Sequence, residues 1–167
     1  MEEIGHGVTI RNFLKPGDLG AVIQLHGLLY GQERGFDYTF EAYVAEPIAQ
    51  FVKEQTDREC IWIAEKDGVV QGSIAIVRVS EVQAQLRWFL LAPSVRGIGL
   101  GRQLMQTAMN FCNIKSYTSV KLLTISEQQT AIRLYESFGF RNVHRRETTL
   151  WGRVVQEEMY EAQLTKK

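Results

Sequence analysis

Between residues 93 and 102 the chain reads Pro93-Ser94-Val95-Arg96-Gly97-Ile98-Gly99-Leu100-Gly101-Arg102. Glycines at three alternate positions let the backbone turn sharply and bring its N–H groups close to a ligand. The stretch lies between a predicted strand and a predicted helix, whose first N–H groups and positive dipole end attract an anion. Because Arg96 and Arg102 add positive charge, the loop predicts a binding site for a diphosphate group.

Three other interpretations of this loop compete with a diphosphate site. One is a glycine-rich turn without a ligand, because a lone GxG pattern is weak evidence. Another is a dinucleotide site, since Gly97 and Gly99 could open a GxGxxG motif and Glu127 stands near the distance of a ribose-binding acid. However, the third glycine of that motif would fall on Arg102, and the loop follows the fourth predicted strand. A Walker A loop is excluded, because no Gly-Lys-Ser/Thr ends the stretch.

Outward from the loop, hydrophobic periodicity and turn residues predict seven strands and four helices. Pro47 is expected to kink or split the second helix, because proline lacks an N–H and clashes with the preceding turn. Short turns favour antiparallel neighbours, and one βαβ crossover is expected. The fold class is therefore α/β (α+β), with helices on a mixed, mostly antiparallel sheet. The strands are expected at 8–14, 60–64, 69–79, 82–92, 119–125, 140–150 and 153–163. The helices are expected at about 19–30, 40–51, 100–115 and 128–138. A loop is expected at 32–39, and the crossover spans 82–125.

The composition predicts one soluble globular domain over residues 1–167. Lys plus Arg and Asp plus Glu both number 19, so the basic excess typical of nucleic-acid-binding proteins is absent. Cys60 and Cys112 form no metal or redox motif and are interpreted as buried apolar residues in a reducing compartment. The N-terminus lacks a signal-peptide pattern, and no apolar run approaches the ~20 residues of a membrane span. We therefore expect a cytoplasmic protein with no metal and neither nucleic acid nor membrane as a partner.

Two motifs, in the same order and spacing, resemble those of the GNAT family of N-acetyltransferases. The family's Arg/Gln-x-x-Gly-x-Gly/Ala pattern, which grips the pyrophosphate of acetyl-CoA, is matched by Arg96-x-x-Gly99-x-Gly101. The family's second motif, Asn-x-x-Ala-x-x-Leu-Tyr-x-x-x-Gly-Phe, is matched by Gln128-x-x-Ala131-Ile132-x-Leu134-Tyr135-x-x-x-Gly139-Phe140. Gln128 replaces the family's asparagine and can make the same hydrogen bonds from a longer stem.

This resemblance covers nearly the whole chain and implies a GNAT fold of about seven strands and four helices. It also implies acetyl-CoA as cosubstrate, without a metal. Tyr135 takes the position of the acid that protonates the departing thiolate, whereas its place on an apolar helical stripe would by itself favour a core aromatic. The implied cofactor-binding residues are Phe89, Leu90, Leu91, Arg96, Gly97, Ile98, Gly99, Leu100, Gly101, Arg102 and Gln128.

The segment from His26 to Ala42 resembles the GNAT domains fused to MarR-type regulators, and we expect a free-standing version of such a domain here. The implied reaction is direct attack of a primary amine, on a small molecule or a peptide, on the acetyl thioester. The alternative is a non-catalytic regulatory module that binds acyl-CoA. A homodimer is implied by the resemblance alone.

The general base and the acceptor site remain open at the level of sequence. Glu33, Glu81 and Glu147 are candidate bases, but each is more typical of a solvated surface charge. His26 is more typical of a hydrogen-bonded packing residue. Arg87 would either meet an anionic acceptor or pair with a carboxylate. Either an aromatic wall around the acceptor or positions in the core are expected for Tyr30, Phe36, Tyr38 and Trp151.

Overall fold

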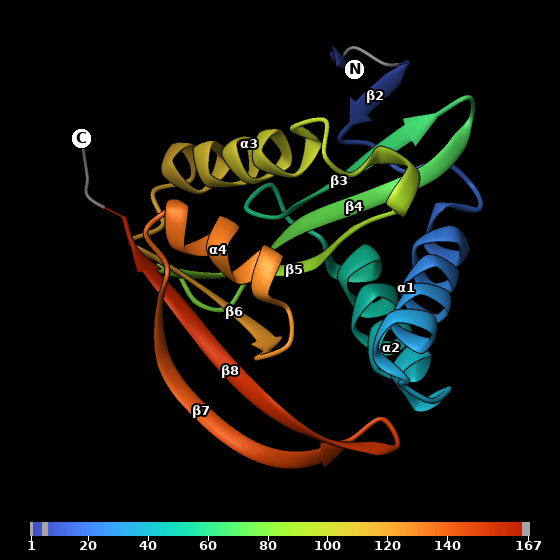
Figure 1. Ribbon diagram of the computed structural model, residues 1–167. Helices are drawn as coiled ribbons and strands as arrows, with labels where there is room; N and C mark the ends of the chain where they lie inside the picture. Colours follow the sequence, from blue (N-terminus) through green and yellow to red (C-terminus); the bar gives the residue numbers. More distant parts are fainter. Residues whose placement is uncertain (1, 5–6, 165–167) are drawn as a thin grey trace.

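A single twisted sheet, with helices on both faces, organises the chain (Figure 1). The structure is a computed structural model and describes residues 2–4 and 7–164. The sheet has eight strands in the order β1-β2-β3-β4-β5-β6-β8-β7, and only β5 and β6 run parallel. The strands are β1 (Glu2–Ile4), β2 (Val8–Arg11), β3 (Cys60–Lys66), β4 (Val69–Arg78), β5 (Gln83–Leu91), β6 (Ser119–Ile125), β7 (Arg141–Leu150) and β8 (Arg153–Gln163).

The helices form two layers, and each layer covers its own part of the core. One part of the core lies under α3 (Leu100–Ile114) and α4 (Gln129–Ser137), and the other under α1 (Asp18–Arg34) and α2 (Thr39–Glu54). A short 3-10 turn, η1 (Pro93–Val95), leads from β5 into the glycine-rich loop. Figure 1 shows the two layers on opposite sides of the sheet. The predicted α/β class and mixed sheet are confirmed.

Three predictions about the N-terminal half are wrong in detail. The structure adds β1, and β2 ends at Arg11 instead of continuing to residue 14. α1 runs on to Arg34, so the expected loop at 32–39 shrinks to a turn after Gly35, whose φ of 70° ends the helix. Pro47 does not split α2, which is continuous from Thr39 to Glu54. The buried stripe of α2 holds both halves on the core, because tertiary packing outweighs one lost hydrogen bond; the stripe consists of Phe40, Val44, Ile48 and Phe51.

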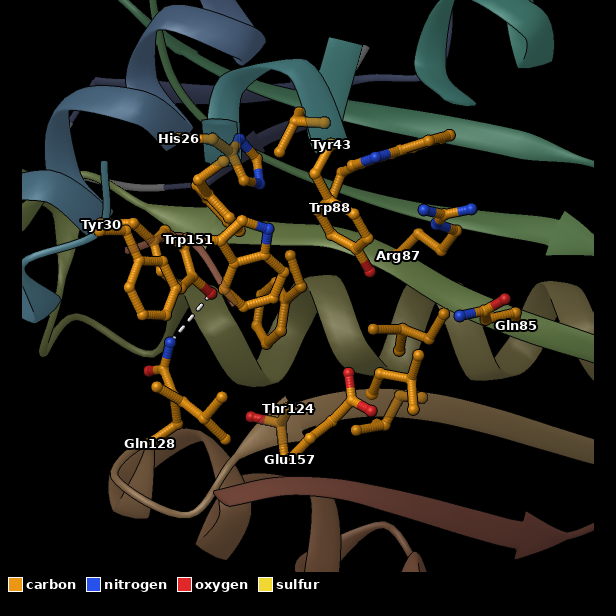
Figure 2. A pocket seen from close by; sticks show the side chains of 18 of the residues that line it. His26, Tyr30, Tyr43, Gln85, Arg87, Trp88, Thr124, Gln128, Trp151 and Glu157 are labelled. Carbon is orange, nitrogen blue, oxygen red and sulfur yellow. Dashed lines mark hydrogen bonds between the residues drawn. The ribbon is translucent and has the colours of Figure 1, made fainter. Parts of the chain in front are cut away.

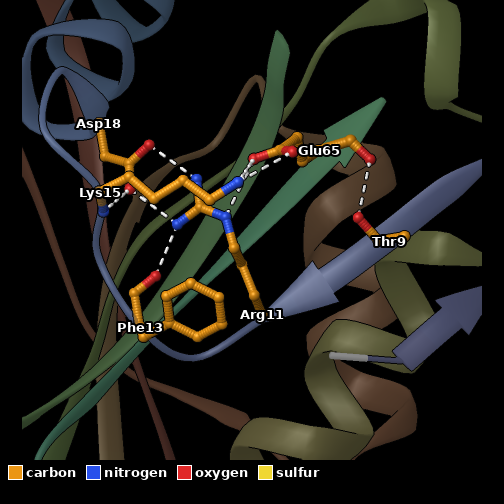
Figure 3. A network of polar contacts seen from close by, with 6 residues as sticks. All are labelled: Thr9, Arg11, Phe13, Lys15, Asp18 and Glu65. Carbon is orange, nitrogen blue, oxygen red and sulfur yellow. Dashed lines mark hydrogen bonds and ion pairs between the residues drawn. The ribbon is translucent and has the colours of Figure 1, made fainter. Parts of the chain in front are cut away.

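A buried charge cluster explains why β2 stops at Arg11 (Figure 3). The Arg11 side chain is only 1% exposed, and both of its terminal nitrogens donate to the Asp18 carboxylate at 2.7 Å. Its Nε donates to Glu65 Oε2 at 3.0 Å, and Nη1 donates to the Phe13 carbonyl at 2.5 Å. Burial opposes ionisation of Asp18, but the hydrogen bonds from Arg11 hold the pKa of that carboxyl below its usual range. The cluster therefore fixes the start of α1 against β2 and β3.

The predicted βαβ crossover is present, and its two strands separate after a short parallel contact. β5 pairs with β6 only from Gln83 to Gln85. Further along, the β4–β5 register shifts by one residue near Trp88, which has a φ of 47°. The buried Ser73 hydroxyl donates to the Trp88 carbonyl at 2.6 Å and so stabilises the irregularity. A bulge of this kind bends its strand, and a wedge opens between the C-terminal halves of β5 and β6.

β6 has the predicted bounds, but the Leu123 side chain is 43% exposed, because the wedge leaves that face of the strand open. After α4, Gly139 has the predicted left-handed conformation, with φ 88°. β7 and β8 form a hairpin with the two-residue turn Trp151-Gly152, in which both residues have positive φ, as hairpin turns of this length require.

Candidate active site

Two cavities meet in the middle of the molecule, at the wedge between β5 and β6. The larger, of about 390 Å³, lies beside the glycine-rich loop and α4. The smaller, of about 100 Å³, lies between β5, β6 and the layer of α1 and α2 (Figure 2). Four side chains line both cavities: Tyr30, Phe89, Gln128 and Tyr135. The two cavities therefore adjoin each other at these four residues.

The glycine-rich loop forms one end of the larger cavity. Gly97 and Gly99 have φ values of 78° and 85°, in the left-handed region, and Gly99 caps the N-terminus of α3. Gly101 lies in the first turn of α3, where a Cβ would contact the side chains of Leu91 and Leu134 at 3.5 Å. The absence of a side chain at these three positions leaves the loop and the positive end of α3 accessible from the cavity.

The structure brings most of the predicted cofactor-binding residues to this cavity and leaves three outside its lining. The Ile98 side chain packs against the core, and that of Leu100 is buried in it. Arg102 instead contacts Ser137 and lies with its Cζ 5.6 Å from the Phe138 ring centroid. The predicted residues that line the cavity are Phe89, Leu90, Leu91, Arg96, Gly97, Gly99, Gly101 and Gln128.

Two arginines bring positive charge to the larger cavity. Arg96 donates through Nε to the Leu91 carbonyl at 2.8 Å and forms a 2.8 Å ion pair with Glu33. Arg34, which the sequence analysis missed, lines the same cavity, and its buried Nε has no hydrogen-bond partner among the described residues. An orphaned buried guanidinium N–H is costly unless a ligand or water accepts from it. The cavity thus fits the diphosphate of acetyl-CoA: Arg34 and Arg96 supply charge, and the loop supplies a glycine cradle.

The edge of β5 between Phe89 and Leu91 runs along the larger cavity. Gly72 of β4 pairs with Leu91, so β4 occupies one edge of this segment. β6 has already separated from β5 after Gln85, and in the described ranges no other strand pairs with the opposite edge. Backbone N–H and C=O groups on that edge are available to an extended ligand such as the pantetheine arm of CoA, in the manner of an added strand.

Tyr135 lies between the two cavities. Its side chain comes from α4, is 6% exposed, and packs with ring centroids 6.1 Å from those of Phe89 and Phe140. Burial is the main cause that raises the pKa of the Tyr135 hydroxyl above its ordinary value, and the nearby Tyr30 adds a smaller effect in the same direction. The hydroxyl therefore stays protonated at neutral pH and is available as a hydrogen-bond donor. The ring belongs to the core and also lines both cavities, so the two sequence interpretations of Tyr135 are compatible.

Gln128 makes a contact that the sequence did not predict. Its Nε2 donates to the hydroxyl of Tyr30 at 2.9 Å, which ties the start of α4 to α1 across the junction of the cavities. Figure 2 shows this hydrogen bond as a dashed line. Burial raises the pKa of Tyr30 to about 12, so its hydroxyl is neutral and accepts the bond at ordinary pH.

The smaller cavity has an aromatic wall and several polar side chains. Of the aromatic residues expected there, Tyr30, Phe36 and Trp151 line it, whereas Tyr38 is 82% exposed and lies elsewhere. Polar side chains come from four strands and helices: β5 contributes Gln85 and Arg87, α1 contributes His26, β6 contributes Thr124, and β8 contributes Glu157 (Figure 2). Because these elements are far apart in the sequence, only the fold brings their side chains together.

The candidate bases fall in different places. Glu33 pairs with Arg96 at the larger cavity, while Glu81 pairs with Arg58 and Arg78, and neither Glu81 nor Glu147 lines a cavity. His26 is buried, and its Nδ1 lies 2.8 Å from the Val22 carbonyl. Burial lowers the pKa of His26 to about 4, so the ring is neutral at pH 7 and donates through Nδ1.

Glu157 is the acidic side chain of the smaller cavity, and the sequence analysis did not identify it. Its Oε1 accepts from Arg146 Nε at 2.7 Å and lies 2.6 Å from Nη2. Its Oε2 has no partner within residues 2–4 and 7–164. Side chains alternate between the two faces of β8, so that Glu157 and the buried Glu158 point to opposite faces of the hairpin. This alternation is the sequence signal that could have identified Glu157.

Three further features of the described residues bear on the predicted class of protein. Cys60 and Cys112 are free and buried in the core, as predicted, and burial raises the pKa of their thiols to about 11 and about 12. No group of three or more His, Cys, Asp or Glu side chains in the described ranges is arranged to hold a metal ion. Nor does any helix there combine the length and apolar character needed to cross a membrane.

Several solved acetyltransferases share this architecture. An acetyltransferase from Streptococcus agalactiae matches with a TM-score of 0.74 and 24% identity, over 95% of this chain and 99% of its own. An N-acetyltransferase from Staphylococcus aureus matches with a TM-score of 0.76 and 21% identity, over the same shares. The Salmonella typhimurium protein yncA, solved with its cofactor acetyl-CoA, matches with a TM-score of 0.74 and 18% identity, over 97% of this chain and 96% of its own. At these identities the likeness establishes the fold.

Curated relatives match about half of this chain. N-acetyltransferase family 8 member 3 of Rattus norvegicus is 34% identical over 87 residues, which cover 49% of this chain and 38% of the rat protein. N-acetyltransferase 8B of Mus musculus is 34% identical over 101 residues, covering 58% of this chain and 44% of the mouse protein. Less than half of either relative is therefore matched.

The region that matches a family model contains the central part of the site. Residues 57–142 match the Acetyltransferase (GNAT) domain family, and they make up just over half of the 167-residue chain. They contain the wedge strands β5 and β6, the glycine-rich loop and Tyr135. Since the family match, the fold and both motifs agree on the same elements, the chain belongs to the GNAT family of acetyltransferases.

Proposed function

We propose that this protein transfers the acetyl group of acetyl-CoA to a primary amine of a small molecule or peptide, and that residues 1–167 act as one acetyltransferase domain. The observation that supports the proposal most directly is the junction of the two cavities at Tyr30, Phe89, Gln128 and Tyr135. A direct transfer needs the thioester and the amine in contact, with water excluded. Two cavities that share one wall provide this arrangement.

In this proposal the larger cavity holds acetyl-CoA as a substrate. The backbone N–H groups of residues 96–102 and the side chains of Arg34 and Arg96 bind the diphosphate. The free edge of Phe89–Leu91 binds the pantetheine arm, and Gln128 lines the same path. One of these strand N–H groups stabilises the negative charge that develops on the thioester oxygen. Ile98, Leu100 and Arg102 act through their backbone or by supporting the loop.

The chemical step is a direct displacement. A free alkylamine has a pKa near ~10.4, so the ammonium first loses a proton, which Glu157 Oε2 or water accepts. The amine nitrogen then forms a bond to the carbonyl carbon, and the bond from that carbon to sulfur breaks. Tyr135, kept neutral by burial, donates a hydrogen bond and then a proton to the departing sulfur, and the second proton that the nitrogen loses as the amide forms restores the Tyr135 hydroxyl. The products are the acetamide, CoA and one proton released to solvent.

The binding half of the proposal is tested by thermal melting with acetyl-CoA, CoA or NAD. Gly101→Leu is the informative variant: its side chain would enter the larger cavity, while the helical backbone at this position carries no positive φ. Gly20→Leu is the matched control, because nothing lies within 4 Å of a Cβ there. Both CoA compounds are expected to raise the Tm of the wild type and of Gly20→Leu, and to lose this effect in Gly101→Leu.

The catalytic half is tested by release of free CoA in the presence of amines. Thiol release that depends on the amine, together with an N-acetylated product by mass spectrometry, is expected for the wild type. Stabilisation by CoA without any amine-dependent release would identify an acyl-CoA-binding module instead. Stabilisation by NAD alone would contradict the assignment of the glycine-rich loop.

A further inference from the structure

Arg87 is a cation without a carboxylate partner, and it lines the smaller cavity. In the described part of the chain no acidic side chain pairs with it, and its Cζ lies 5.1 Å from the centroid of the Trp88 ring. Most arginines in this molecule that line no cavity are paired with an acid; Arg11, Arg58, Arg78, Arg145 and Arg146 are examples. Contact with the indole holds the guanidinium in place without neutralising its charge.

The local backbone determines where Arg87 points. Gln85 is the last residue of β5 that pairs with β6, and Arg87 is the next residue on the same face, where the wedge has opened. The register shift at Trp88 follows immediately, and the hydrogen bond from Ser73 holds it. Arg87 is therefore fixed at the mouth of the wedge, and Figure 2 shows Arg87 and Gln85 on the same strand beside the cavity.

Glu157 lines the same cavity from β8, on the other side of the wedge. No ion pair joins it to Arg87, although both charges border one cavity of about 100 Å³. Its Oε1 is occupied by Arg146, which leaves Oε2 available to an added donor. A cavity with a free cation on one wall and a carboxylate oxygen on the other complements a ligand that carries both signs of charge a few ångströms apart.

We infer that the acceptor is a small primary amine that also carries a carboxylate, as an amino acid does. Arg87 binds the acceptor's carboxylate, and Glu157 Oε2 accepts a hydrogen bond from its nitrogen. This inference rests on the proposed function and narrows its substrate class. The transfer is the displacement described above, so the same bonds form and break, and the acceptor's carboxylate is unchanged in the product. The aromatic wall around Tyr43 and Trp151 favours acceptors with an apolar side chain.

The test compares three series of acceptors: phenylalanine, methionine and glutamate, each beside its α-carboxamide and its decarboxylated amine. The kcat/KM of every compound is measured for the wild type, Arg87→Gln, Arg87→Lys and the control Arg78→Gln. Arg78 loses the same charge but pairs with Glu81 outside both cavities. Comparing the ratio of carboxylate to carboxamide between enzymes cancels the intrinsic difference in amine basicity.

We expect the wild type and Arg78→Gln to favour at least one carboxylate over its carboxamide by tenfold or more. In Arg87→Gln this ratio should fall at least tenfold, mainly through KM, while Arg87→Lys keeps part of it. If amines are acetylated with a ratio that Arg87→Gln does not change, the inference is overturned and the proposed function stands. If no acceptor of the three series is acetylated while other primary amines are, the inference is overturned and the proposed function stands; if no primary amine of any kind is acetylated, both are overturned.

Discussion

Gln128 Nε2 donates a 2.9 Å hydrogen bond to the hydroxyl of Tyr30, a residue 98 positions earlier in the chain. Asparagine, the residue that the GNAT motif carries here, is one methylene shorter and would not reach Tyr30. We therefore expect Gln128→Asn and Tyr30→Phe each to lower the free energy of unfolding by about 1 kcal/mol. The double variant should lose little more than either single variant, with a coupling of about 1 kcal/mol in a urea-denaturation cycle. Strictly additive losses would show that this hydrogen bond does not contribute to stability.

Tyr135→Phe removes a hydroxyl without removing a core ring. In the described ranges that hydroxyl makes no hydrogen bond, so the Tm should change by no more than a few degrees. If the hydroxyl serves the departing sulfur, kcat should fall by about 10² to 10⁴ while the Kd of acetyl-CoA stays within about twofold. Tyr117→Phe is the matched control. It loses a 2.8 Å hydrogen bond to the Arg58 carbonyl outside both cavities and should keep the wild-type kcat. An unchanged kcat in Tyr135→Phe would assign the residue to packing alone.

The ion pair between Glu33 and Arg96 competes with any anion that Arg96 binds. Glu33→Gln removes the competitor, and a half-exposed pair of this kind contributes about 0.2 to 1 kcal/mol. The Kd of acetyl-CoA should therefore fall by a factor of about 1.4 to 5, and Arg96→Gln should raise it. Isothermal titration at low salt measures both effects. A weaker affinity in Glu33→Gln would mean that the pair positions Arg96 for binding.

Gly72 is a position of close approach between β4 and β5. A Cβ there would lie 2.5 Å from the Leu90 carbonyl oxygen and 2.5 Å from the Leu91 side chain, both beside the larger cavity. Gly72→Ala should thus destabilise the fold by about 1 to 3 kcal/mol and weaken acetyl-CoA binding, because β5 has to move. Gly20→Ala, where a Cβ meets nothing within 4 Å, should instead stabilise α1 by about 0.5 to 1 kcal/mol. Normal cofactor affinity in Gly72→Ala would show that β5 adjusts without disturbing the cavity.

His26 makes stability depend on pH on the acid side. Burial lowers its folded-state pKa to about 4, below the unfolded value near 6.5. Its contribution is therefore complete above pH 6.5 and is lost as the pH falls toward 4, by about 3 kcal/mol in total. His26→Asn, which keeps a donor for the Val22 carbonyl, should flatten the denaturation free energy over this range. His144→Asn on the exposed strand β7 is the control, and an equal flattening there would contradict the assignment to His26.

Much of the fold and part of the site could be predicted from the sequence, because their signals are local. Hydrophobic periodicity predicted the bounds of β6 and the buried face of α2. The residue types at Asp67-Gly68 and Gly139 are typical of turns, and in the structure all three have positive φ. The glycine-rich loop could be assigned because its function depends on adjacent residues. The cytoplasmic location, the homodimer and the likeness to MarR-linked domains stay predictions.

Other features depended on contacts between distant segments, and the sequence alone did not determine them. Arg34 and Glu157 were missed because α1 and β8 approach the two cavities only after the sheet has formed. Pro47 was expected to kink or split α2, but α2 is continuous, because four buried side chains on one face outweigh the missing hydrogen bond. Local sequence thus determined most of the elements and the glycine-rich loop. Tertiary packing decided where β5 leaves β6, and therefore which charges line the smaller cavity, because burial and pairing are properties of the assembled chain.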